Sequence, residues 1–196
     1  MRYFVEDIPS TELAILPTRD DVPVDLDTVE SAVVYVETTA LTTFVSSEAI
    51  TAEWPATSLF TEEGLYRVTL VLTFDDGGVE TFQVQPIVVE DASTGWHTSV
   101  TASGVWVNSL NDVQLFELLT IARTQIESFA PELVSGNLPP LSYRQAQVMQ
   151  ARNILNAAKS DPSQSEDGSF FLLRPYPLDN IIKQLLRPKR AVPVVG

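Results

Sequence analysis

The sequence contains no cysteine and only one histidine, His97, among its 196 residues. The absence of cysteine excludes a disulfide scaffold, a thiolate zinc site and a cysteine nucleophile. A single histidine cannot build a histidine metal cluster, and no G-x-S-x-G motif accompanies it to suggest a hydrolase triad. The glycine motifs that hold phosphates and dinucleotides are absent too. We therefore expect no catalytic residue, no metal, no cofactor and no enzymatic activity, and we interpret His97 as an exposed linker residue.

Long apolar runs are also absent. No segment approaches the length of a membrane span, and the N-terminal MRYFVEDIPS has no apolar core of signal-peptide length. We expect synthesis in the cytoplasm and no partner in the membrane. The densest acidic run, residues 20–30, lacks the glycine and final glutamate of a Ca²⁺-binding EF-hand loop and alternates with Val and Leu. It is typical of a solvated strand.

Positive charge is scarce in the first half of the chain. Residues 1–95 hold 18 Asp and Glu against 3 Lys and Arg, a net charge of −15, whereas residues 96–196 hold 8 against 9, a net charge of +1. This asymmetry indicates two modules with different surroundings. The acidic module should repel nucleic acid.

Residues 1–91 have the pattern of an antiparallel β-sandwich of immunoglobulin-like size. The runs 29–38 and 65–74 are rich in β-branched and aromatic residues. Asp75-Asp76-Gly77-Gly78 tolerates positive φ and precedes VETFQVQPIVVE, which predicts a hairpin. We expect weaker strands at 12–16, 22–26 and 49–54.

Residues 92–104 are small and polar, as in a linker, and residues 105–196 have helical periodicity. One helix is predicted from an Asn111–Gln114 capping box to Pro131, and a second from a similar box at Ser142–Gln145 to Asp161. A third should run from Pro177 to Pro188. The fold class is therefore α+β: a β-sandwich, and a small helical bundle with an extended C-terminal tail.

The second predicted helix contains three basic residues and no acidic one. Their stripe either meets an acidic partner or is an ordinary solvated face. Phe170 and Phe171 belong to an apolar run that either packs on the helices or contacts another subunit. We take these residues as a secondary candidate interface: Arg144, Arg152, Lys159, Phe170 and Phe171.

The C-terminal tail combines positive charge with valines that are too apolar for a solvated terminus. An extended peptide of this kind can add a strand to the sheet edge of another protein. Folding back onto its own domain is the alternative. The tail residues that we expect to contact a portal or a neighbouring subunit are Arg187, Lys189, Arg190, Val192, Val194 and Val195.

Three segments of the second half, QAQVMQARNILNAAKSDPS, EDGSFFLLRPYPLD and IIKQLLRPKRAVPVVG, carry a family resemblance. Together they resemble the head-to-tail adaptor (connector, head-completion) proteins of long-tailed actinobacteriophages. The resemblance covers about residues 105–196, and its most specific pieces are RPYPLD and LLRPKR-x-VPVV. It does not cover the acidic module, which is similar to the immunoglobulin-type modules that phage virion proteins carry.

The resemblance implies a virion protein of the phage neck, located at the head–tail interface. Its partners would be the portal protein, further copies of itself in a ring (a dodecamer in that family) and the tail completion or stopper proteins. DNA would pass through the ring without specific binding. The alternative function is a β-sandwich that binds carbohydrate or a host surface, with Trp54, Phe60 and Tyr66 lining its site and the helices serving only for attachment.

Overall fold

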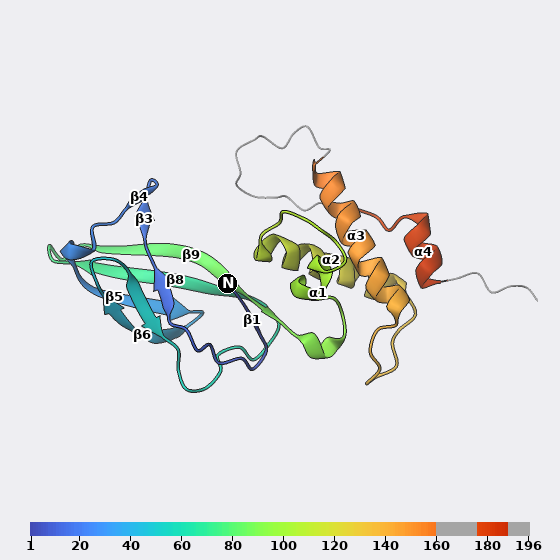
Figure 1. Cartoon of the computed structure of the whole chain (residues 1–196), viewed down its shortest axis with the longest axis horizontal. Coiled ribbons are helices and arrows are strands. Elements are labelled where there is room, and N and C mark those ends of the chain that lie inside the picture. The colour runs from blue at the N-terminus through green and yellow to red at the C-terminus, as the bar shows by residue number, and fades with distance from the viewer. Residues whose placement is uncertain (160–175, 188–196) are drawn as a thin grey trace, which may run out of the picture. The chain divides into compact units, whose positions relative to one another are not determined.

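The computed structural model describes residues 1–159 and 176–187. The protein is a mixed α/β protein with a large curled β-sheet and a few helices (Figure 1). Its contacts divide it into two compact units, Met1–Asp91 and Ala92–Gly196. We call the first the β unit and the second the helical unit.

The β unit is built from nine strands and one 3₁₀ turn. Seven strands form one sheet in the order β1-β9-β8-β5-β6-β7-β2, and β3 pairs with β4 alone. The elements are β1 Arg2–Phe4, β2 Leu13–Ile15, β3 Thr18–Arg19, β4 Val22–Pro23, η1 Leu26–Thr28, β5 Val29–Val36, β6 Thr39–Val45, β7 Ile50–Glu53, β8 Gly64–Phe74 and β9 Val79–Glu90.

Alternating apolar residues make the sheet curl around a single core. Val68, Leu70 and Leu72 of β8 point to the same side and are almost fully buried, as the period-two pattern predicts. The same core contains Leu13 of β2 and Ile50 of β7, from the opposite end of the strand order. Strands from the two ends of the sheet therefore cover one another.

The predicted hairpin is confirmed, because β8 and β9 pair across the Asp75–Gly78 turn with Gly77 at φ 82°. The interpretation as a purely antiparallel sheet is wrong at one edge, where β1 pairs parallel to β9. Sequence reasoning also missed β6, although Thr39–Val45 is rich in Thr, Val and Phe. No turn motif separates β6 from β5 as clearly as the Asp-Gly pair does in the later hairpin.

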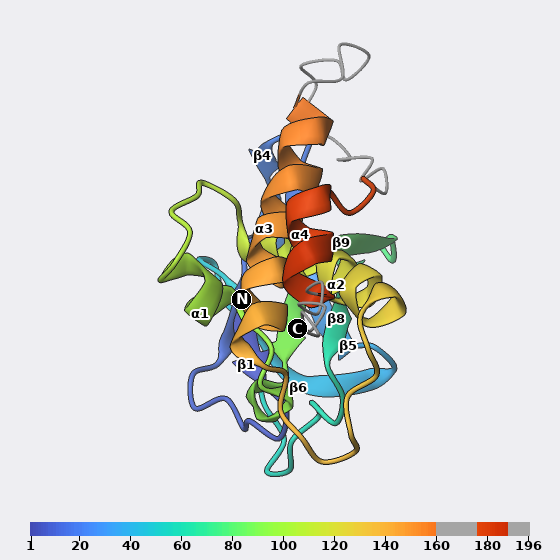
Figure 2. The same ribbon diagram turned by 90° about the vertical axis from the view of Figure 1, so that its right-hand side faces the viewer.

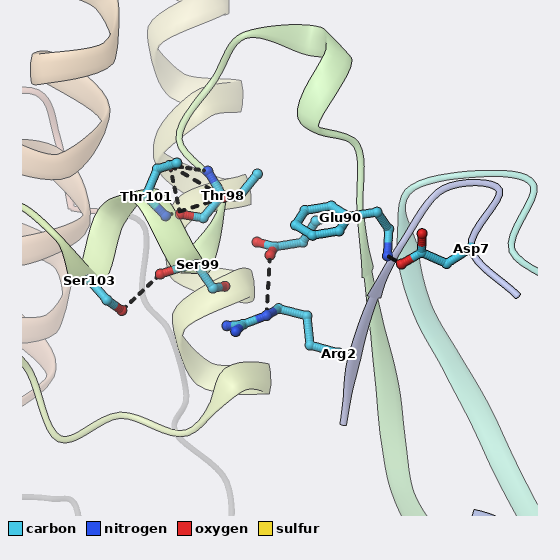
Figure 3. A network of polar contacts seen from close by, with 8 residues as sticks. Arg2, Asp7, Glu90, Thr98, Ser99, Thr101 and Ser103 are labelled. Carbon is cyan, nitrogen blue, oxygen red and sulfur yellow. Dashed lines mark hydrogen bonds and ion pairs between the residues drawn. The ribbon is translucent and has the colours of Figure 1, made fainter. Parts of the chain in front are cut away.

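The 92–104 segment, expected to be a linker, is folded into the helical unit. It contains η2, Ala92–Thr94, and α1, Ser99–Ser103. Thr98 and Thr101 form a reciprocal capping box that starts α1 (Figure 3). Trp96 and Ala102 are buried, and these apolar anchors outweigh the polar composition of the segment.

The described residues of this unit form three further helices: α2 Asp112–Phe129, α3 Leu141–Lys159 and α4 Asn180–Leu186. The capping box of α2, Asn111 with Gln114, is confirmed. The predicted cap of α3 is wrong, because Ser142 lies inside the helix and the Pro140 carbonyl accepts from the Tyr143 and Arg144 N–H groups. In the part of the chain that the structure describes, no helix is long and apolar enough to cross a membrane.

Helix α4 begins at Asn180 rather than at Pro177. Asp179 is its N-cap, and its carboxylate accepts a 2.8 Å hydrogen bond from the Ile182 N–H. A side-chain acceptor satisfies the free N–H groups of a first turn, which proline at the first position cannot do. Leu186 and Ile182 then bury the short helix against Ile126 and Tyr143.

We predict that Gly95→Ala destabilises the chain by about 2–4 kcal/mol, because it adds a steric clash to left-handed strain. Gly95 has φ 73°, and a Cβ there would lie 2.9 Å from Leu138 Cδ2. Gly136→Ala is the matched control: φ is 83°, but nothing lies within 4 Å of the new Cβ, so only about 1–2 kcal/mol should be lost. Urea unfolding followed by tryptophan fluorescence compares the two; equal losses would contradict the clash.

Candidate functional site

Helix α3 presents positive charge to solvent without compensating acids. Arg152 and Lys159 are exposed, lie seven residues apart and therefore share a side of the helix. No residue of α3 is acidic, and within the described residues neither cation forms an ion pair. The predicted basic stripe is present at these two positions.

Arg144, the third residue of the expected stripe, behaves differently. It is only half-buried, but its Nε is buried and makes no hydrogen bond among the described residues. Burial lowers the pKa of His97, and the nearby Arg144 charge lowers it further. Arg144 therefore belongs to the contact between α3 and the segment before α1 rather than to the solvent face.

That contact is held by Gln147, which is almost fully buried on α3. Its Oε1 accepts a 2.9 Å hydrogen bond from the His97 backbone N–H. Its Nε2 donates to the Leu119 carbonyl of α2 at 3.2 Å and to the His97 carbonyl at 3.5 Å. One side chain thus ties α3 to α2 and to the start of the helical unit.

Two more amide side chains of α3 form hydrogen bonds with the segment that leads into α4. Gln150 Nε2 donates to the Tyr176 carbonyl at 2.7 Å and to Gln125 Oε1 of α2 at 2.6 Å. Asn153 Nδ2 donates to Asp179 Oδ2 at 2.9 Å, the carboxylate that caps α4. Figure 2 shows α3 and α4 side by side, as these bonds require. Sequence reasoning missed all three amides, because polar residues on a helix give no sign of burial.

The first residue of the predicted tail interface, Arg187, lies at the end of α4. Its guanidinium stacks over the Phe129 ring at 4.7 Å, a cation–π contact with the last residue of α2. Burial raises the pKa of Tyr143, while the Arg187 charge acts in the opposite direction. The other predicted contact residues lie outside the described residues: Lys189, Arg190, Val192, Val194, Val195, Phe170 and Phe171.

The β unit gathers carboxylates at the tip of the β8–β9 hairpin. The Asp75 N–H donates to the Thr28 carbonyl at 3.0 Å, which brings η1 beside this turn. A hollow of about 490 Å³ opens here, lined by Arg19, Thr28, Phe74, Asp75, Asp76, Gly78 and Glu80. The Arg19 guanidinium donates a hydrogen bond to the Glu80 carboxylate. We define the acidic end as Asp25, Asp27, Asp75, Asp76 and Glu80.

The aromatic residues considered for a carbohydrate site pack together instead. Phe60 is fully buried and lies 5.3 Å from the Tyr66 ring and 5.7 Å from Trp54, measured between ring centroids. Tyr3 stacks on Phe60 at 5.2 Å. On the other face of the sheet, Figure 3 shows Arg2 facing the buried Glu90. Arg2 Nε and Glu90 Oε2 lie 4.0 Å apart. The aromatic side chains stabilise the β unit.

His97 is partly buried rather than exposed, and its Nδ1 lies 3.1 Å from the Thr101 hydroxyl. The described residues contain no group of three carboxylates or histidines that could hold a metal ion. Charge of one sign gathers on two surfaces, the exposed side of α3 and the acidic end.

Comparison with protein-family models, with curated proteins and with solved structures found no match to this chain.

We predict that Gln147→Met lowers the free energy of unfolding by about 1–3 kcal/mol, because it leaves the partly buried His97 N–H and the Leu119 carbonyl without their partner. Gln145→Met is the matched control, since Gln145 is exposed on the same helix and its replacement should change stability by less than about 0.5 kcal/mol. Denaturant unfolding gives both values. Equal effects at the two positions would contradict the role of Gln147.

We predict that lowering the pH destabilises the wild-type chain more than it destabilises the His97→Gln variant. The folded pKa of His97 lies below its ordinary value of 6.5, so the unfolded chain takes up the proton first as the pH falls. Its contribution to stability is complete above pH 6.5 and is lost as the pH falls toward the lower folded pKa. Hydrogen exchange of residues 95–103, measured from pH 7.5 downward, should show faster opening only in the wild type. Identical pH profiles would refute this.

Proposed function

We propose that this chain is a structural protein of a bacteriophage neck, an adaptor that forms a ring between the portal and the tail completion proteins. The supporting observation is that two segments with the family resemblance contact each other. Gln150 and Asn153 of the first segment bond to Tyr176 and Asp179 of the second. Tyr176 and Asp179 belong to RPYPLD, one of the most specific pieces of the resemblance, and both bond to α3 at the start of α4.

The β unit, in this proposal, is an added immunoglobulin-like sandwich on that adaptor. One half of its curled sheet contains β5, β8 and β9, the other β7 and β2, and both contribute to one core. Its 18 acidic residues against 3 basic ones within residues 1–91 suit a protein beside a DNA channel, because DNA would pass without adhering. We propose that it braces the ring or decorates the virion.

The direct test is cryo-electron microscopy of particle necks. We expect density for α2, α3 and α4 beside the portal, repeated around the axis of the particle. Density for this chain only on the capsid shell or the tail tip would overturn the proposal. A monomer in solution would be compatible with it, since a ring can form on the portal.

We predict that deleting residues 188–196 leaves the folded chain intact but prevents the joining of heads and tails. The tail contributes Lys189, Arg190 and three valines to the proposed contact with the portal or a neighbouring copy. A matched variant, V192S/V194S/V195S, keeps the length and charge and removes only the apolar groups. Electron microscopy of particles complemented with each chain should show tailless heads. Normal particles from the truncated chain would refute the tail contact.

A further inference from the structure

The outer face of α3 has the properties of an interface for an acidic protein surface. Its exposed residues are Leu141, Gln145, Arg152, Asn156 and Lys159, which lie on one side of the helix. Leu141 is 67% exposed and provides an apolar contact at the start of the helix. Arg152 and Lys159 stand about 10 Å apart along the axis, at 1.5 Å per residue. We call these five residues the basic face.

The complementary surface is the acidic end of the β unit. Asp75, Asp76 and Glu80 line the hollow at the β8–β9 turn, and the Arg19 guanidinium is hydrogen-bonded to Glu80. Asp25 and Asp27 are the N-cap and a residue of η1, which the Asp75 N–H contacts through the Thr28 carbonyl. The Asp27 and Asp75 side chains are exposed and make no hydrogen bond within the described residues. Val79, which follows the turn directly, is 63% exposed. This surface therefore also combines charge with an apolar contact.

We propose that copies of this chain associate head to tail, with the acidic end of one copy docked on the basic face of α3 in the next. A second copy is the favoured partner because the acidic end and the basic face carry opposite charges. Duplex DNA is a poor competitor, because a chain of net charge −14 repels phosphates over most of its surface. Each copy supplies both surfaces in equal number, and pairing of two different patches produces rings or filaments.

In the proposed ring, neighbouring copies would meet through these two surfaces. Only the closure of the contacts into a ring rests on the proposed function; the contact itself does not. Exposed charge pairs contribute little individually and are screened by salt. Their main effects are on the association rate and on the choice of partner. Association of free chains should therefore be weak and should strengthen as the ionic strength is lowered.

A charge-swap experiment on the full-length chain tests the contact. Arg152→Glu with Lys159→Glu reverses the charge of the basic face. Asp27→Lys with Asp75→Lys removes most of the negative charge of the acidic end, because five carboxylates become three carboxylates and two ammonium groups. Each double variant alone should associate at least about tenfold more weakly than the wild type at low salt, since like charges meet in the first and the attraction is lost in the second. An equimolar mixture of the two should recover association, because the unchanged acidic end of one variant can dock on the unchanged basic face of the other. Arg152→Lys with Lys159→Arg keeps the charge and should behave as the wild type.

Sedimentation velocity over a range of protein concentrations and ionic strengths measures these effects, and circular dichroism checks that each variant is folded. Wild-type chains that remain monomeric at the highest concentration and lowest salt would overturn the proposal. So would association that persists in both double variants, or a mixture that fails to recover it. The proposal would also be overturned if the basic-face variant lost binding to duplex DNA while its self-association stayed unchanged. That outcome would show that the basic face binds phosphates. Because purified protein is used, none of these outcomes depends on whether the chain lies in a phage neck.

Discussion

The helical unit depends on three amide side chains spaced three residues apart on α3. Gln147 bonds to the backbone of His97 and Leu119, Gln150 to Gln125 and Tyr176, and Asn153 to Asp179. Each bond ends on a group in another segment of the unit. A polar group buried without a partner costs free energy, so these bonds favour the observed arrangement of the segments around α3.

This arrangement decides which parts of the unit can meet a partner. The amides and the apolar residues occupy the buried sides of α3, and the exposed side retains Arg152 and Lys159. One apolar cluster of the helical unit contains Ile126 of α2, Tyr143 of α3 and Ile182 of α4, and it packs α4 against the other two helices. Arg187 is held over Phe129 at the point where α4 ends.

The β unit obeys a different constraint. Its curled sheet buries alternate side chains of β5, β8 and β9, so most of its carboxylates lie on the outside or at turns, whereas Glu90 is buried. Mutual repulsion of these charges is tolerable while water and salt screen them. A partner that supplies positive charge relieves it. The acidic end and the basic face of α3 are therefore complementary in sign as a consequence of how each unit buries its apolar residues.

Local pattern in the sequence determined the strands around the Asp75–Gly78 hairpin, the buried face of β8 and the Asn111–Gln114 cap of α2, since each depends on residues close together in the chain. Charge counts determined the contrast between the two halves. Only the tertiary structure decided that residues 92–104 are packed, that β1 pairs parallel to β9, and that Gln147 and Gln150 are buried. It also separated Arg144 from the exposed Arg152 and Lys159. These features arise from contacts between residues far apart in the chain, which no local period records.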